Sequence, residues 1–271
     1  MIAFVTAGEF LAPNALFGLP APLSLSWFPM RVAVLERSNG DVVLVDAGLS
    51  AAELAAPRRE LGASGLLFFV RGGERAAAAA RLAALGIAPG RVKAIVATHL
   101  HLDHIGAFVD FPNAEVITTA AELAAARRYG TRQGYVHVDA LVRSGRVRPV
   151  LLEATPRHGF PGWLDLFGDG RVVLLDCRGH SAGHVAVLLT DPVAGRTALC
   201  AGDAAFAPHE YRALSLSPFA RLNRFRESWL RESWGHLRAF ESAHPETPVV
   251  LAHSKDPAGD WGRYASIGGH E

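Results

Sequence analysis

Cysteine is scarce in this sequence, which contains only Cys177 and Cys200. Two cysteines cannot form the dense framework of disulfide bonds found in small secreted domains, so we expect a reducing compartment, the cytoplasm. No apolar run reaches the roughly 18 residues of a membrane-spanning helix. The first 20 residues are apolar, but they lack a basic segment, and Glu9, Pro13 and Pro20 interrupt them. A secretory signal is therefore not expected.

A surplus of charge of one sign is also absent, since 27 Lys and Arg residues face 26 Asp and Glu residues. This balance provides no long-range field for gathering nucleic acid or anionic lipid, so neither partner is expected. Half of the residues are hydrophobic, which excludes a disordered chain. The length of 271 residues suits one large domain, and we expect a single domain over residues 1–271.

Two segments of that domain differ from the rest. Residues 1–30 form an apolar arm that we expect to pack on the domain. The alternative is that this arm acts as a lid over the site or as a dimer arm. In the latter case the protein would be a homodimer. Residues 130–170 have weak periodicity and several Gly and Pro residues. This composition favours an insertion of loops and one short helix, where substrate specificity is often set.

Apolar runs and turn residues predict the secondary structure. Asn39-Gly40 is a strong hairpin signal, because both central residues of the expected turn need a positive φ. We expect strands over residues 31–37, 42–45, 92–98, 115–118, 172–176, 185–190, 197–201 and 249–252, a strand or loop over 66–70, and helices over 50–61, 74–85, 105–109, 120–128 and 221–243. Strand-rich and helical segments thus alternate in two similar halves, which favours an α/β layered sandwich.

Histidine is frequent, with 12 residues, and three of them fall within Thr98-His99-Leu100-His101-Leu102-Asp103-His104. This segment follows the buried strand predicted over residues 92–98. Residues two apart in an extended chain point the same way, so His99 and His101 can converge on one point. After the chain turns, Asp103 and His104 can serve a neighbouring point. Imidazole and carboxylate groups are ligands that suit Zn²⁺ and related divalent ions.

A single histidine at the end of a strand is usually exposed or hydrogen-bonded. Three histidines and an aspartate in this alternation have no such explanation, because burying them without a metal ion would leave several polar groups unpaired. Later candidates also lie at the ends of predicted strands: the two histidines of segment 179–184, Asp203 and His253. Sites in α/β proteins gather at such sheet edges, so we predict a metal site there.

These residues resemble the motifs of the metallo-β-lactamase superfamily. The match consists of the 99–104 run, His184, Asp203 and His253, together with Asp46 in Leu44-Val45-Asp46-Ala47-Gly48. All five motifs come in the order of the family, over residues 31–253. The resemblance implies an αββα sandwich, in which two mixed sheets are flanked by helices.

The resemblance also implies a role for each residue. The implied ligands are His99, His101 and His184 for one metal ion, Asp103, His104 and His253 for a second, and Asp203 as the bridge between them. Asp46 would hold the ligand loops in place without touching a metal ion, and His180 would be a structural hydrogen bonder. Zinc is the expected metal, with manganese, cobalt and iron as alternatives.

Two such cations, about 3.5–4 Å apart and bridged by hydroxide, provide a nucleophile at neutral pH and polarise a carbonyl group. Asp103 is the expected catalytic residue, because it can orient the hydroxide or pass a proton to the leaving group. We therefore expect a metal-dependent hydrolase that acts on a small ester.

Residues 98–107, followed by Phe111-Pro112-Asn113-Ala114, are most similar to the N-acyl homoserine lactonases of the superfamily. That resemblance implies a lactone substrate and a role in quorum quenching. Those lactonases commonly carry a tyrosine three residues beyond the bridging aspartate, where this chain has Phe206, which cannot donate a hydrogen bond. The candidate pocket residues are Phe206, Phe68, Phe69, Tyr135 and Trp163.

Other hydrolases of the superfamily are the alternative, namely thioesterases, phosphotriesterases and arylsulfatase-like enzymes. True β-lactamases are disfavoured, because their ligand sets lack the bridging carboxylate implied for Asp203. A di-iron redox protein of the same fold ranks lower, since such proteins normally carry a flavodoxin-like domain for which this chain is too short.

Overall fold

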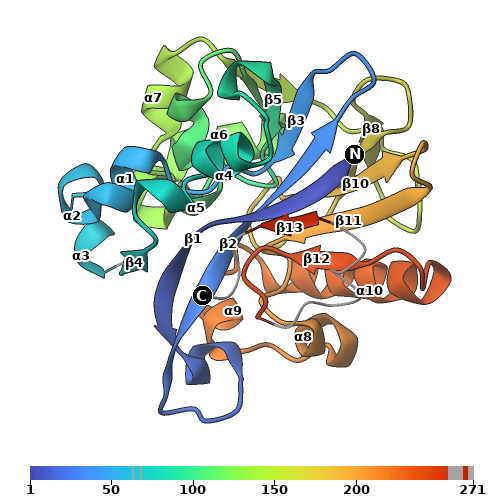
Figure 1. Ribbon diagram of the computed structural model, residues 1–271. Helices are drawn as coiled ribbons and strands as arrows, with labels where there is room; N and C mark the ends of the chain where they lie inside the picture. Colours follow the sequence, from blue (N-terminus) through green and yellow to red (C-terminus); the bar gives the residue numbers. More distant parts are fainter. Residues whose placement is uncertain (63, 68, 256–264, 268–271) are drawn as a thin grey trace.

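The computed structural model describes residues 1–62, 64–67, 69–255 and 265–267, and in them two mixed β-sheets lie face to face (Figure 1). The larger sheet has the order β13 (Ala265–Ile267), β1 (Ile2–Pro13), β2 (Leu25–Glu36), β3 (Val42–Val45), β5 (Val92–Val96), β6 (Glu115–Thr119) and β7 (Val147–Val150), and β4 (Val70–Arg71) pairs with β1. The smaller sheet has the order β12 (Val249–Leu251), β11 (Arg196–Gly202), β10 (Val185–Asp191), β9 (Val172–Asp176) and β8 (Trp163–Asp165).

Alternating apolar side chains hold the two sheets together. In β10, Val185, Val187 and Leu189 belong to the core between the sheets, whereas Ala186 and Leu188 belong to the core on the other face. This division follows from strand geometry, because successive side chains point to opposite faces. Both faces of the smaller sheet are buried as a result.

Helices cover the outer face of each sheet (Figure 1). Leu82, Ala126 and Leu141 pack on the larger sheet, and Trp234 and Leu237 pack on the smaller one. The α-helices are α1 (Ala51–Ala55), α2 (Pro57–Glu60), α3 (Ser64–Leu67), α4 (Ala78–Ala84), α5 (Leu102–Ile105), α6 (Ala120–Tyr129), α7 (Val138–Arg143), α8 (Pro208–Ala213), α9 (Pro218–Leu222) and α10 (Glu227–Ala243). The 3₁₀ helices are η1 (Asn14–Phe17), η2 (Glu74–Ala76), η3 (Pro89–Arg91), η4 (Gly106–Asp110) and η5 (Gly130–Gln133). The αββα sandwich expected from the sequence is confirmed.

The N-terminal segment is part of the larger sheet rather than an arm laid on the domain. β1 and β2 pair antiparallel along nearly their whole length and form a ribbon that extends beyond the sandwich (Figure 1). Three buried rings of this ribbon, Phe10, Phe17 and Phe28, stack on one another. The apolar character of residues 1–30 therefore reflects a strand pair with its own share of the core.

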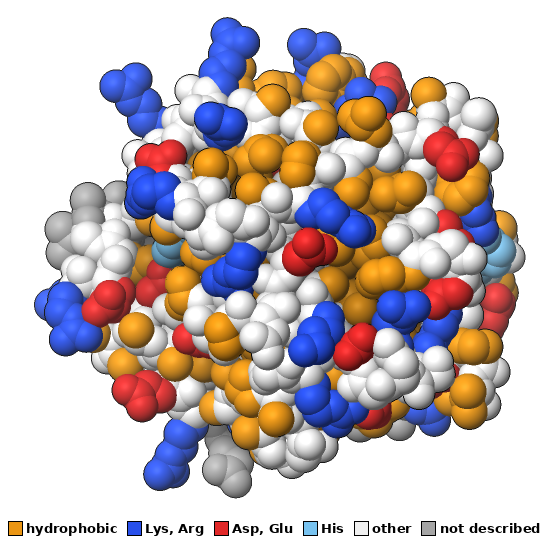
Figure 2. Space-filling model, turned by 90° about the horizontal axis from the view of Figure 1, so that it is seen from above, with side chains coloured by type: hydrophobic (Ala, Val, Ile, Leu, Met, Phe, Trp, Pro, Cys, Tyr) orange, Lys and Arg blue, Asp and Glu red, His pale blue; other side chains and the backbone are white. Residues whose placement is uncertain are grey.

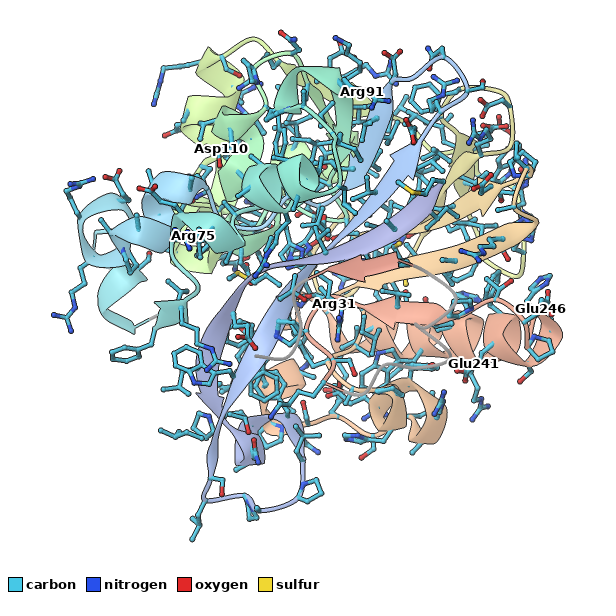
Figure 3. The ribbon with its side chains drawn as sticks, viewed as in Figure 1. Arg31, Arg75, Arg91, Asp110, Glu241 and Glu246 are labelled. Carbon is cyan, nitrogen blue, oxygen red and sulfur yellow. The ribbon has the colours of Figure 1, made fainter. Side chains whose placement is uncertain are left out.

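The hairpin predicted at Asn39-Gly40 joins β2 to β3, but its turn differs from the expected one. Gly40 has φ 84°, whereas Asn39 does not have a positive φ. The Gly40 N–H donates to the carbonyl of Arg37, which is consistent with a three-residue loop that needs glycine only at its last position. Arg91 anchors the turn, since its guanidinium donates to the Gly40 carbonyl and pairs with Glu36 (Figure 3).

Three predicted segments have other structures. Region 130–170, expected to hold loops and one helix, also supplies the edge strands β7 and β8. Residues 66–70 are divided between the end of α3 and the start of β4. The single helix expected over 221–243 is two helices, because the Phe225 and Arg226 N–H groups donate to the carbonyl of Gly179 instead of continuing the helix.

The surface has no concentration of one charge on the face seen in Figure 2, where Lys and Arg side chains are interspersed with Asp and Glu. Within the part of the chain that the structure describes, no helix has the length and apolarity needed to cross a membrane.

Candidate metal centre

Four segments from both sheets meet at one end of the sandwich. The 99–104 run follows β5 of the larger sheet, while segment 179–184 precedes β10, Asp203 follows β11 and His253 follows β12 of the smaller sheet. The Val185 N–H donates to the carbonyl of Thr98 at 2.9 Å, so the backbones are also joined at this point. Residues more than 150 positions apart in sequence thereby share one site.

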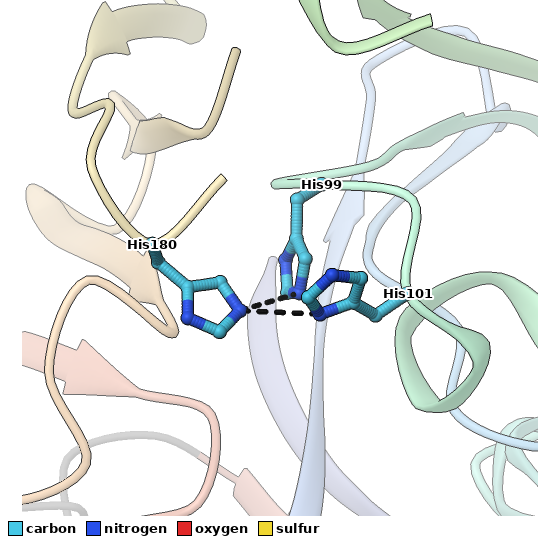
Figure 4. Close-up of side chains that lie close together, drawn as sticks. All are labelled: His99, His101 and His180. Carbon is cyan, nitrogen blue, oxygen red and sulfur yellow. Dashed lines mark hydrogen bonds between the residues drawn. The ribbon is translucent and has the colours of Figure 1, made fainter. Parts of the chain in front are cut away.

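Three imidazole rings form the first cluster and point toward one another (Figure 4). His180 Nε2 lies 3.2 Å from His99 Nε2 and 3.2 Å from His101 Nδ1. His99 and His180 are buried, and His101 is half-buried. Zinc binds imidazole nitrogen at about 2.0–2.1 Å, so one ion placed among these three nitrogens matches their spacing.

Asp103, His104 and His253 form the second cluster, and Asp203 lies between the two clusters. Asp103 Oδ2 is 3.3 Å from His253 Nε2 and 3.9 Å from His104 Nε2. Asp203 Oδ1 is 3.2 Å from His253 Nε2 and 3.4 Å from His104 Nε2, whereas its Oδ2 is 3.6 Å from His180 Nε2. Each carboxylate oxygen of Asp203 thus faces a different cluster, as a bridging ligand must.

His184 belongs to neither cluster, which corrects the ligand set expected from the sequence. Its Nδ1 donates to the carbonyl of Cys177 at 3.1 Å, and its Nε2 accepts from the Asp203 N–H at 3.2 Å. Both ring nitrogens are therefore occupied by the protein. His180, rather than His184, lies beside His99 and His101, which makes His180 the candidate third ligand of this cluster.

The carboxylates of Asp103 and Asp203 favour bound cations, either protons or metal ions, in the second cluster. Burial lowers the pKa of His101 to about 4, so this ring is neutral at pH 7, the form that binds a metal ion. Burial also acts on His253, but the carboxylates of Asp203 and Asp103 outweigh it and raise the pKa of His253 to about 10. The pKa of His104 is raised well above its usual value, because nearby carboxylates again outweigh burial. Any divalent cation bound here would displace these protons.

Two buried atoms of the centre fit a further partner, such as a metal ion. Among the described residues, His104 Nε2 and Asp203 Oδ1 are buried without a hydrogen-bond partner, although they lie 3.4 Å apart. A buried polar atom left without a partner costs free energy, so native proteins seldom keep one. A metal ion coordinated by both atoms removes this cost, and the imidazole and carboxylate donors suit zinc.

Asp46 supports the second cluster from behind. Its Oδ2 lies 2.8 Å from His104 Nδ1, and its Oδ1 accepts from the Thr98 N–H at 2.8 Å. These contacts leave His104 Nε2 directed at Asp203. Asp46 has φ 60°, a conformation that Asp and Asn adopt more readily than most residues.

We expect Asp46→Ala to weaken metal binding by about 10–100-fold without removing a ligand, because the His104 ring loses the acceptor that orients it. Titration of the metal-free protein with Zn²⁺ would measure this change. Asp46→Asn is the matched variant, since Asn keeps the size and tolerates the positive φ while removing the charge. An unchanged affinity in both variants would mean that Asp46 does not position His104.

Glu122 is a buried residue beside the candidate centre that the sequence did not reveal. Its carboxylate accepts from the Leu100 N–H at 3.1 Å, from Ser181 Oγ at 2.7 Å and from the Gly183 N–H at 2.9 Å. Leu100 lies between two ligands, and Ser181 follows His180, so this one buried side chain ties together the two loops of the first cluster. In the sequence, Thr119-x-x-Glu122 resembles an ordinary helix cap, and only the Thr119 half of that cap forms.

A cleft of about 610 Å³ reaches the centre, and its lining includes ligand residues of both clusters. Of the expected pocket residues, Tyr135 lines this cleft. Phe206 is not among the lining residues of this cleft, although its ring centroid lies 5.8 Å from that of His180. Phe69 is exposed, Trp163 donates to Thr155 Oγ1, and both lie outside the lining. Phe68 lies outside the described residues.

The apolar part of the lining comes from residues that the sequence predicted as core or arm. Phe10 of β1 and Phe219 and Leu222 of α9 line the cleft. Phe10 also packs edge-on against His253, with ring centroids 4.9 Å apart. An apolar residue near a strand or helix end looks the same in sequence whether it faces a core or a cleft.

Comparisons with known proteins identify the family of this chain. The family model described as the metallo-beta-lactamase superfamily matches residues 28–243. The N-acyl homoserine lactonase AttM of Azorhizobium caulinodans is 28% identical over 203 residues, which are 75% of this chain and 72% of that protein. A probable metallo-hydrolase of Mycobacterium tuberculosis is 30% identical over 245 residues, covering 83% of this chain and 74% of its own length.

Solved structures show the same fold. An N-acyl homoserine lactone hydrolase with N-hexanoyl-L-homoserine bound at its catalytic metal center has a TM-score of 0.73 at 20% identity, over 94% of this chain and 93% of that one. The dizinc quorum-quenching lactonase AidC has a TM-score of 0.66 at 11% identity, over 95% and 88%. Since the family match covers most of the chain and the relatives are hydrolases, this protein belongs to the metallo-beta-lactamase superfamily and is a hydrolase.

Proposed function

We propose that this protein binds two divalent metal ions, with zinc as the first candidate, and hydrolyses a small ester, of which a lactone such as an N-acyl homoserine lactone is the leading example. The observation that carries this proposal is the position of Asp203, whose two oxygens face two separate ligand clusters at the base of one cleft. The first ion would be held by His99, His101 and His180. The second would be held by Asp103, His104 and His253.

When bound, a pair of such ions lowers the pKa of water and polarises the carbonyl to be attacked. The chain itself supplies orientation and proton transfer. Asp103 lines the cleft and can exchange a proton with the leaving group, since it lies at the boundary between the second cluster and the open space. Phe10 and Phe219 cover the neighbouring wall and keep water away from that side of the substrate.

The lactone assignment is supported by the AttM lactonases and by the lactone-hydrolase structures among the similar proteins. The 610 Å³ cleft has the size of a small-molecule site. Cytoplasmic location, quorum quenching and a homodimer stay predictions from the sequence and its resemblance.

The test is a joint measurement of metal content and ester turnover. Protein reconstituted with Zn²⁺, Mn²⁺, Co²⁺ or Fe²⁺ would be analysed for bound metal and assayed on N-acyl homoserine lactones, linear esters, thioesters and a phosphotriester. We expect two metal ions per chain and turnover of lactones above that of the thioester and phosphotriester. Two bound ions without hydrolysis of any of these compounds would refute the proposed function.

Phe206→Tyr tests the lactone assignment specifically. We expect it to raise kcat/KM for lactones by about tenfold, because a phenol hydroxyl at this position can donate a hydrogen bond to the lactone oxygen. The rate for a linear ester of equal chain length serves as the reference. Phe69→Tyr adds the same hydroxyl at an exposed position outside the cleft lining and should not have this effect. An unchanged lactone rate in Phe206→Tyr would count against the lactone.

A further inference from the structure

We propose that, among small esters and lactones, the cleft favours those that carry a carboxylate in addition to the scissile group, and that Arg132 and Arg226 bind this carboxylate. The inference rests on the proposed function, because it assigns a substrate class to the same cleft. Among the described residues that line the cleft, the charged ones outside the metal centre are Arg132, Arg224 and Arg226, and all three are positive. The carboxylates in the lining, Asp103 and Asp203, belong to the metal centre.

Arg132 is held close to the first cluster by its own turn. This residue lies in η5, and the carbonyl of Gly134, two residues later, accepts a hydrogen bond from the Leu102 N–H at 3.1 Å. Gly134 has φ 81°, and a Cβ at this position would lie 3.2 Å from the His101 ring. The turn therefore packs closely against His101 in a backbone conformation that favours glycine, so the backbone of the exposed Arg132 is held near the first cluster.

Arg226 is held in the same manner by the other ligand loop. The N–H groups of Phe225 and Arg226 donate to the carbonyl of Gly179, the residue before His180, at 2.8 and 3.1 Å. The Arg226 guanidinium lies 4.2 Å from the centroid of the Trp229 ring. Stacking on an aromatic face orients a guanidinium while leaving its N–H groups free to bind a carboxylate in their plane.

The charges of these two arginines are not balanced by the protein. Arg224 pairs with Glu227 at 3.2 Å, whereas neither Arg132 nor Arg226 has a carboxylate partner among the described residues. Two unpaired cations in one concave surface concentrate the field there and attract an anion. A neutral acyl lactone would leave both unpaired. The apolar lining residues Phe219 and Leu222 suit a hydrocarbon segment between the ester and the carboxylate.

A matched pair of esters tests this inference on the metal-loaded full chain. Mono(4-nitrophenyl) glutarate ends in a carboxylate, and 4-nitrophenyl pentanoate has a methyl group in its place. We expect a KM about tenfold lower for the glutarate ester, and we expect Arg132→Gln with Arg226→Gln to abolish this difference between the two esters. Added salt should reduce the preference in the unmodified protein.

The control variant, Arg127→Gln with Arg238→Gln, removes the same amount of charge from exposed positions outside the cleft lining. It should keep the preference, so an equal effect of both double variants would overturn the inference, as would equal KM values for the two esters. Calorimetric titration with glutarate and pentanoate gives a second readout that does not need turnover. If neither ester is hydrolysed but glutarate still binds about tenfold more tightly, the proposed ester hydrolysis fails and the carboxylate site stands.

Discussion

His180→Ala is expected to leave one metal ion per chain instead of two and to reduce ester turnover by about 100-fold or more, because it removes one of three nitrogen ligands from the first cluster. His184→Ala is expected to keep both metal ions in the folded protein. We expect His184→Ala to destabilise the folded protein instead, because the Asp203 N–H and the Cys177 carbonyl each lose their hydrogen-bond partner. We expect that loss to lower the free energy of unfolding by about 2–3 kcal/mol.

His180 and His184 are four residues apart, and the same substitution is made at each. Comparing the two variants therefore distinguishes a metal ligand from a structural residue. Metal analysis after removal of loosely bound ions and urea unfolding would be measured on both variants. His236→Ala, which changes a half-buried histidine outside both clusters, controls for the loss of any imidazole. If His184→Ala lost a metal ion while His180→Ala kept two, the ligand set proposed from the geometry would be wrong.

Glu122→Ala is expected to be the most destabilising substitution near the site. It leaves the Leu100 N–H, the Ser181 hydroxyl and the Gly183 N–H buried without their acceptor. At about 1–3 kcal/mol for each of the three unsatisfied groups, a total of about 3–9 kcal/mol is expected. For a chain of this size, the melting temperature should fall by about 10 °C. Bound metal should also decrease, because the two loops of the first cluster are no longer tied together.

Glu122→Gln distinguishes lost hydrogen bonds from lost volume. Its remaining oxygen can still accept from Ser181 and Gly183, and only the contact with Leu100 is lost, so we expect roughly a third of the destabilisation. Glu232→Ala, at an exposed position of α10, should have almost no effect. Thermal unfolding followed by circular dichroism measures all three. A melting temperature for Glu122→Ala equal to that of the unmodified protein would contradict the role assigned to this carboxylate.

Much of the fold could be predicted because its signals are local. The apolar runs that became β9 and β10 and the order of strand-rich and helical halves indicated an α/β layered sandwich. The 99–104 run was recognisable because its spacing places several ligands at one strand end. Asp203 and His253 were accessible to the same reasoning, since each follows an apolar strand directly.

The remaining features depend on contacts between distant segments. His180 and His184 are equivalent in a linear pattern, and only the contact of His184 with Cys177 and Asp203 decides which ring faces the centre. Glu122 follows the pattern of a helix cap, although its carboxylate turns toward two loops instead. The break between α9 and α10 was likewise hidden, because Phe225 finds its backbone acceptor, Gly179, far away in the sequence.

The position of the ligand residues on strands of both sheets has a mechanical consequence. β5 belongs to the larger sheet, and β10, β11 and β12 belong to the smaller one. Metal ions held by residues at the ends of these strands would therefore link the two sheets. Free energy of metal binding then adds to the adhesion of one half to the other. Chelation should loosen that end first, with amides of Thr98 and Val185 gaining hydrogen exchange before those in the centre of β10.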